Sequence, residues 1–211
     1  RVFEIVNDKK GFSNLKQIQG KELSHNNYLD SFNAYSLVND FDKQSKVCAI
    51  IKHNNPCGCA SDTNGLKAYL NALSGDPTSA FGGVVAFNYS IDEGIATEIV
   101  KTFYEVILTP KVSDEAKKIL SSKKSLRVLE YELVENSPSF SVAFMQKTFL
   151  LQDENFSSLT KKDLKIVTKA KPTEAEINNL LFANQVCKHV KSNAIVITKD
   201  NKTLGVGAGQ T

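Results

Sequence analysis

Short apolar runs alternate along the chain with segments whose apolar residues recur at helical spacing. The apolar runs have the length and β-branched content of buried strands, and they cover residues 46–51, 83–87, 106–108 and 126–129. The segments with helical spacing predict helices packed on a sheet, and they cover residues 27–42, 66–73, 91–103 and 113–120. This alternation favours a layered α/β fold.

The order changes in the last third of the chain. Residues 141–151 are predicted to be extended, but they lie outside the regular alternation. A new helix is expected to open at Pro172 and Thr173 and to end near Val190.

A final pair of strands is predicted after this helix. The β-like run 194–198 is expected to pair with residues 203–206, because Asp200-Asn201 between them is typical of a hairpin turn. We therefore expect one α/β unit over residues 1–171 and the start of a second unit over residues 172–211.

Composition and charge restrict the class of protein. The chain has 211 residues, of which 41% are hydrophobic, so it can bury one sizeable core. Its 26 basic and 23 acidic residues are too balanced to favour a nucleic-acid or membrane surface, and small anions fit better as ligands. There is no membrane-spanning apolar run and no signal peptide, which predicts a cytoplasmic protein. The four cysteines lack the spacing of a disulfide framework, so we expect reduced thiols.

Two side chains suited to acid–base chemistry follow the strand predicted at 46–51. Lys52 and His53 come directly after this run, and Pro56 and Gly58, which are typical of turns, follow them. In open α/β sheets, ligands bind at the carboxyl ends of strands, where loops converge without disturbing the core. The pair is therefore a candidate site, with a solvated loop tip as the plain alternative.

The same stretch contains the elements of a rival chemistry, a metal site. His53, Cys57 and Cys59 are of the residue types that bind zinc. Zinc deaminases, however, combine a His-x-Glu element with a Pro-Cys-x-x-Cys element, and here only Pro56-Cys57-Gly58-Cys59 is present. We therefore predict no metal.

A glycine-rich string at 205–210 must be distinguished from a dinucleotide-binding loop. Its glycines are spaced differently from the Gly-x-Gly-x-x-Gly fingerprint that joins a first strand to its helix. Close approach of the backbone in a turn is the better interpretation.

Three strings are distinctive when taken together, namely residues 52–58, 75–83 and 205–210. They closely resemble the formyltransferase domain of the bifunctional purine-biosynthesis family, in which AICAR transformylase is joined to IMP cyclohydrolase. Residues 15–24 and 27–34 are similar to the entry segment and the first helix of that family.

The resemblance implies a layered αβα fold of the cytidine-deaminase-like type. It places the first such subdomain at residues 1–171, although 120–171 matches weakly, and the start of a second, truncated subdomain at residues 172–211. The IMP cyclohydrolase domain is expected upstream of this chain. Family segments that contribute arginines to substrate binding are expected on both sides of it.

The activity implied by the resemblance is transfer of a formyl group from 10-formyltetrahydrofolate to the amine of AICAR, on the route to IMP. The family assembles its transformylase site across a dimer interface, so a homodimer is expected. Because the flanking segments are missing, the alternative is that these residues form a folded substrate-binding or dimer-forming segment without turnover.

The resemblance implies three catalytic residues. His53 is the expected base for the aromatic amine, since an imidazole titrates close to neutrality. Lys52 is expected to stabilise developing negative charge and to assist departure of tetrahydrofolate. Asn193 is expected to hold the formyl oxygen or the substrate carboxamide, because an amide donates and accepts at once. A turn residue at a strand entry is the alternative for Asn193.

The resemblance implies binding residues on both sides of the reacting centre. Asn27 and Glu105 are expected to bind AICAR, and their alternatives are a helix cap and a solvated strand end. Phe81 and Gly82 are expected to line the folate side, because an aromatic face suits a pterin or benzoyl ring and glycine permits close approach. Core packing is the alternative for Phe81.

Overall fold

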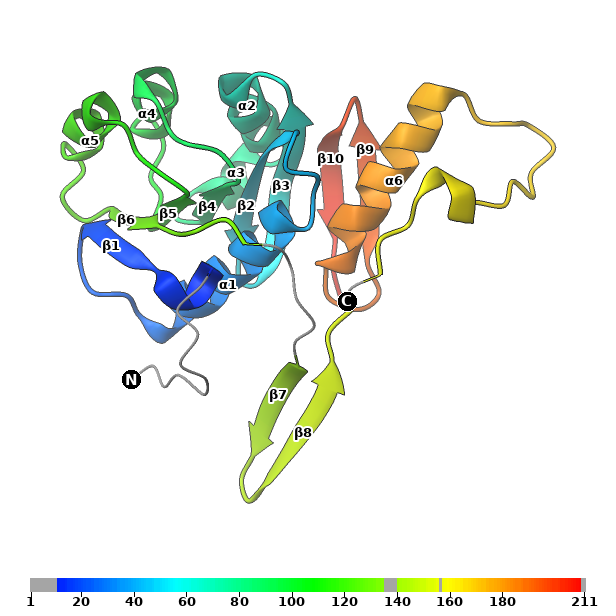
Figure 1. Ribbon diagram of the computed structural model, residues 1–211, viewed down its shortest axis with the longest axis horizontal. Coiled ribbons are helices and arrows are strands. Elements are labelled where there is room, and N and C mark those ends of the chain that lie inside the picture. The colour runs from blue at the N-terminus through cyan, green and yellow to red at the C-terminus, as the bar shows by residue number, and fades with distance from the viewer. Residues whose placement is uncertain (1–10, 135–139, 156, 210–211) are drawn as a thin grey trace.

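The computed structural model of this protein describes residues 11–134, 140–155 and 157–209. Gln210 of the glycine-rich string and residues 1–10 of the first predicted unit lie outside the described residues. The centre of the fold is an eight-stranded sheet (Figure 1). In spatial order its strands are β1 (Lys16–Gln19), β6 (Arg127–Glu130), β5 (Val106–Thr109), β4 (Val84–Phe87), β2 (Lys46–Lys52), β3 (Asn55–Asp62), β10 (Lys202–Gly207) and β9 (Ile195–Lys199).

The sheet is mixed. Strands β4, β5 and β6 run parallel to one another, and the other neighbouring pairs are antiparallel. The strands predicted at 46–51, 83–87, 106–108 and 126–129 correspond to β2, β4, β5 and β6, so this part of the sequence-based prediction is confirmed.

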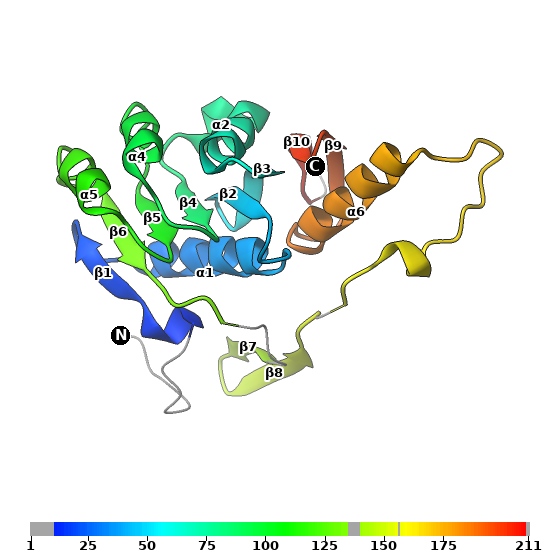
Figure 2. The ribbon, with the colours of Figure 1, turned by 45° about the horizontal axis from the view of Figure 1, so that its top comes forward.

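Helices cover both faces of the sheet, as Figure 2 shows. Helices α2, α4 and α5 pack on one face, and α1 and α6 pack on the other. The helices are α1 (His25–Asn39), α2 (Gly65–Gly75), α3 (Pro77–Ala80), α4 (Glu93–Ile99), α5 (Asp114–Leu120) and α6 (Glu174–Lys188), with 3₁₀ turns at Gly11–Asn14 and Lys161–Asp163. No helix in the described part of the chain is long and apolar enough to cross a membrane. The predicted layered α/β architecture is confirmed.

Strand β2 shows why the central strands read as unbroken apolar runs. Cys48 and Ile50 pack in the core under α2, α4 and α5, whereas Ala49 and Ile51 pack in the core under α1. A strand buried on both faces has no solvent-facing positions, so polar residues do not alternate along it.

Side-chain caps determine where two helices begin. Ser24 and Asn27 form a reciprocal capping box at the start of α1, and Thr173 and Glu176 form another at the start of α6. The helix expected to open at Pro172 and Thr173 is therefore confirmed. The helix predicted at 91–103 is shorter than expected, because α4 ends at Ile99.

The prediction that Pro56 and Gly58 belong to a turn is wrong, because both lie within strand β3. The turn is shorter and consists of His53 and Asn54, whose φ angles are 53° and 63°. Two central residues with positive φ make a type I′ hairpin, which joins β2 directly to β3. Pro56 is tolerated in the strand because the pairing with β2 shifts register between Ile50 and Ile51, as at a β-bulge.

The hairpin predicted near the end of the described chain is confirmed. Strands β9 and β10 pair antiparallel around Asp200 and Asn201, whose φ angles are 52° and 53°. Strand β10 also joins β3, and the Thr203 hydroxyl accepts the N–H of Cys59 at 2.9 Å. Strands of both predicted units thus share one sheet. The division at 171/172 and the likeness to a cytidine deaminase stay predictions.

A second hairpin stands apart from the layered domain (Figure 1). Strands β7 (Phe140–Met145) and β8 (Thr148–Asp153) pair with each other and form a separate sheet. The residues of both strands are exposed. The extended segment predicted at 141–151 outside the regular alternation is therefore confirmed.

Candidate active site at the end of strand β2

Lys52 ends strand β2 and joins the hairpin to the loop before β4. Its ammonium Nζ donates to the backbone carbonyls of Phe81 at 3.0 Å and Gly82 at 2.9 Å. Gly82 has a φ of +68°, and a Cβ added there would lie 3.0 Å from Lys52 Nζ. A side chain at position 82 would therefore strain the backbone and crowd the lysine. The structure thus places Lys52 against the pair of residues predicted for the folate side.

Phe81 does not belong to the core, so the core-packing alternative is wrong. Its side chain is 62% exposed, and its ring lies 5.2 Å from the ring of Phe103, which is 47% exposed. The carbonyl of Phe103 also accepts the N–H of Gly82 at 2.7 Å. Phe103 was not among the predicted site residues, because helical spacing had placed it at the end of a helix. Its signal in the sequence is an aromatic residue two positions before Glu105.

Asn27 and Glu105 are brought together although they are far apart in the sequence. The Asn27 amide Nδ2 donates to Glu105 Oε2 at 2.7 Å, while its Oδ1 accepts the N–H of Ser24 at 3.0 Å. Asn27 is therefore a capping residue, as the plain alternative held, and also a partner of Glu105. Glu105 lies beside the loop at 81–83, because its N–H donates to the carbonyl of Gly83 at 3.0 Å.

His53 is at the tip of the hairpin, and its side chain is exposed. Asn55 links this tip to the segment that follows α6. Its Nδ2 donates to the carbonyl of His53 at 3.4 Å, and its Oδ1 accepts the N–H of Lys191 at 3.2 Å. Asn193 follows two residues later, exposed and with a φ of 62°, at the bend before β9. Within the described residues no hydrogen bond joins Asn193 to Lys52 or His53, so the link runs through Asn55.

A hollow of about 310 Å³ adjoins the turn. It is lined by Phe32, Asn33, Ser36, Asn54, Glu154, Asn155, Lys188, His189, Val190 and Lys191. A larger cavity of about 750 Å³ lies between α6, β9 and the segment at 168–172, and none of the predicted site residues lines it. Asn54 of the turn lines the smaller hollow, whereas the predicted site residues line neither of these two cavities. We place the candidate site at the end of β2, where Lys52 is hydrogen-bonded to the loop of Phe81 and Gly82.

The two thiols near His53 lie on opposite sides of the sheet, Cys59 buried and Cys57 partly buried. Cys57 packs against the core under α2, and Cys59 packs in the core under α1. Burial raises the pKa of Cys57 to about 12, and burial also raises the pKa of Cys59. The described residues contain no cluster of three or more His, Cys, Asp or Glu side chains able to hold a metal ion, and the four cysteines are free.

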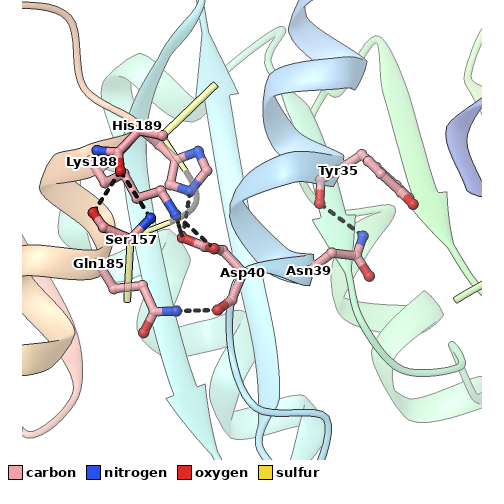
Figure 3. A network of polar contacts seen from close by, with 8 residues as sticks. Tyr35, Asn39, Asp40, Ser157, Gln185, Lys188 and His189 are labelled. Atoms are coloured by element: carbon pink, nitrogen blue, oxygen red, sulfur yellow. Dashed lines mark hydrogen bonds and ion pairs between the residues drawn. The ribbon is translucent and has the colours of Figure 1, made fainter. Parts of the chain in front are cut away.

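A polar cluster holds the end of α6 against the end of α1 (Figure 3). Asp40, the C-cap of α1, accepts a hydrogen bond from Lys188 at 2.9 Å, and His189 Nε2 lies 3.0 Å from its Oδ2. Gln185 donates to the backbone carbonyl of Asp40. Burial acts to raise the pKa of Asp40, but the contacts with His189 and Lys188 outweigh burial and hold that pKa below its ordinary value. The cluster thus fixes the end of α6, and the bond from Lys191 to Asn55 ties the segment that follows it to the hairpin.

Replacing Asp40 tests this cluster. We expect Asp40→Asn to lower the free energy of unfolding by about 1–3 kcal/mol at pH 7, because Lys188 loses its counter-charge in a largely buried place. The pKa of Asp40 is depressed on folding, so its contribution is present above the unfolded value and is lost as the pH falls through the folded value. Urea unfolding at pH 7 and pH 3 measures the difference in free energy of unfolding between the wild type and Asp40→Asn. This difference should be smaller at pH 3. An equal difference at both pH values would contradict this account.

The comparisons with known proteins agree on one family. A family model described as "AICARFT/IMPCHase bienzyme" matches residues 2–211. Three curated relatives, each called a bifunctional purine biosynthesis protein PurH, are 44% identical in Caldicellulosiruptor saccharolyticus, 46% in Rhodospirillum rubrum and 46% in Aquifex aeolicus. These matches cover 97%, 96% and 99% of this chain, but only 39%, 38% and 40% of the relatives. The chain thus spans about two fifths of the length of those relatives, and it belongs to the AICARFT/IMPCHase bienzyme family.

Proposed function

We propose that this chain carries part of the active site of an AICAR formyltransferase in purine biosynthesis. The reaction transfers the formyl group of 10-formyltetrahydrofolate to the amine of AICAR, and the parent protein also carries IMP cyclohydrolase. The observation that carries the proposal is the contact of Lys52 with the loop of Phe81 and Gly82, beside which Glu105 is held by Asn27. Membership of the family supports the same reaction.

His53 and Lys52 divide the chemistry between them. The attacking amine of AICAR is aromatic and a weak nucleophile, so a base that removes its proton during attack lowers the barrier. The exposed imidazole of His53 is free to take that proton. An ammonium carries three donors, and two donors of Lys52 are directed at carbonyls. The third donor remains for the formyl oxygen, on which negative charge develops.

The binding residues lie around this pair. Asn27 and Glu105 present a buried amide and a half-buried carboxylate that suit the polar groups of AICAR. Phe81 and Phe103 present an exposed aromatic surface for a planar ring of the folate, next to the loop at Gly82.

Asn193 completes the site in the proposal. The bond from Lys191 to Asn55 ties the segment that carries Asn193 to the hairpin. In the proposal the Asn193 amide supports the formyl oxygen or the carboxamide. In the proposal the enzyme works in the cytoplasm as a homodimer, without a metal, and the family segments outside these residues complete the site. The second candidate function is binding without turnover by this chain alone, and it is favoured by the coverage of only about two fifths of the relatives.

Single-turnover formyl transfer tests the proposal. Full-length protein and the 211-residue chain are compared at equal concentration, with 10-formyltetrahydrofolate and AICAR as substrates. Transfer by the full-length protein supports the formyltransferase, and transfer by the short chain would eliminate the binding-only candidate. Absence of transfer by the full-length protein would overturn the proposed function.

The same assay tests the aromatic surface. We expect Phe103→Ala to raise the KM for 10-formyltetrahydrofolate about 10-fold, because one stacking face worth about 1.4 kcal/mol is removed. The KM for AICAR should stay within about twofold, since Phe103 faces Phe81 rather than Glu105. Phe103→Tyr keeps the ring and is the control. An unchanged KM for the folate would show that the ring does not contact it.

A further inference from the structure

The hairpin turn that carries His53 has a backbone conformation that is uncommon for residues other than glycine, although asparagine tolerates it better than most. His53 and Asn54 both have positive φ, at 53° and 63°, and neither is glycine. Most side chains collide with the backbone in this region, and type I′ turns therefore prefer sequences such as Asn-Gly. A turn of this composition needs support from the surrounding structure to hold one conformation.

Helix α1 supplies that support through two side chains one turn apart. Asp30 Oδ1 accepts the backbone N–H of Asn54 at 2.7 Å, and Asn33 Nδ2 donates to Asn54 Oδ1 at 2.9 Å. Both side chains are half-buried, and a hydrogen bond to a carboxylate is stronger than one between neutral groups. Asn54 is therefore held at its backbone and at its side chain.

The two side chains that hold Asn54, Asp30 and Asn33, belong to a rigid helix. Helix α1 packs on the sheet through Ala34, Leu37 and Val38, which are fully buried. The same helix carries Asn27 and its contact with Glu105. Helix α1 thus connects the proposed AICAR-binding pair to the turn of the proposed base, and it sets their separation.

We propose that Asp30 is a positioning residue for formyl transfer, with Asn33 in support. It fixes the positive-φ backbone of Asn54, and through it the direction in which the His53 imidazole leaves the turn. Asp30 does not touch the reacting atoms in this account. The inference rests on the proposed function. Its energetic basis is that a displacement of about 1 Å of a catalytic group costs up to about 100-fold in rate.

The test uses the full-length protein and separates kcat from KM. Asp30→Ala should lower kcat about 10- to 100-fold, with both KM values within about twofold, because substrate contacts are kept while the base is displaced. Asp30→Asn should keep most of the activity, since its amide oxygen still accepts the N–H of Asn54. Asp114→Ala, an exposed aspartate in the first turn of α5, is the matched control.

A glycine at position 54 distinguishes positioning from other roles. Glycine adopts positive φ without strain, so the turn no longer depends on the hydrogen bonds from Asp30 and Asn33. The double variant Asp30→Ala/Asn54→Gly should therefore reach kcat within about threefold of Asn54→Gly alone. This comparison remains valid even where Asp30→Ala alone does not fold.

The outcomes separate this inference from the function on which it rests. If the wild-type protein does not transfer formyl, the proposed function fails. If the wild-type protein is active and Asp30→Ala has the wild-type kcat, the positioning role is overturned. A double variant at least about 10-fold slower than Asn54→Gly would also overturn it, because Asp30 would then act on something other than the turn.

Discussion

Replacing His53 with asparagine in the full-length protein is expected to lower the rate of formyl transfer by about 10²–10⁴-fold, the usual contribution of a general base. Asparagine is the appropriate replacement, because position 53 has a φ of 53° and asparagine tolerates this region better than alanine. The turn should therefore persist while the proton acceptor is lost. Single-turnover transfer at saturating AICAR and 10-formyltetrahydrofolate measures the chemical step.

His25→Asn is the control for this experiment. His25 is the first residue of α1 and is exposed, like His53. It should retain the wild-type rate. A His53→Asn protein that transfers formyl within a few-fold of wild type would remove His53 from the mechanism and leave the base unidentified.

Gly58→Ala is expected to lower the free energy of unfolding by about 2–4 kcal/mol. A Cβ at position 58 would lie 2.1 Å from the carbonyl oxygen of Ala72 in helix α2. This neighbour is backbone, so it cannot move away as the end of a flexible side chain can. Strand β3 and α2 would have to separate, with loss of packing under the whole helix.

Gly205→Ala in β10 is the matched control, because it makes the same change in a strand where no heavy atom lies within 4 Å of the added Cβ. Its free energy of unfolding should change by less than about 0.5 kcal/mol. Urea unfolding followed by circular dichroism measures both variants. Equal stability of the two variants would show that β3 and α2 can separate at little cost.

The local elements of the fold could be predicted from the sequence because their causes are local. The unbroken apolar run of β2 follows from burial on two faces, and the start of α6 follows from the capping box of Thr173 and Glu176. The turn at Asp200 and Asn201 likewise depends on two neighbouring residues that tolerate positive φ.

Strand β3 could not be predicted from the sequence, because the contacts that stabilise it come from distant parts of the chain. Pro56 and Gly58 are typical of turns, and only the register shift opposite Ile51 and the close approach of Ala72 make a strand of them. The turn at His53 and Asn54 is therefore shorter than the sequence pattern predicts. Its positive φ is stabilised by α1, which precedes it by about 20 residues in the chain.

The sequence by itself determined the layered class of fold, the family and the residue types available for chemistry. Only the tertiary structure decided which of them meet: Lys52 with the carbonyls of Phe81 and Gly82, and Asn27 with Glu105, 78 positions away. It also added Phe103 and Asp30, which periodicity assigns to helices. The physical reason is that hydrogen bonds and ring contacts act over a few ångströms in space, whereas sequence patterns report only on neighbours along the chain.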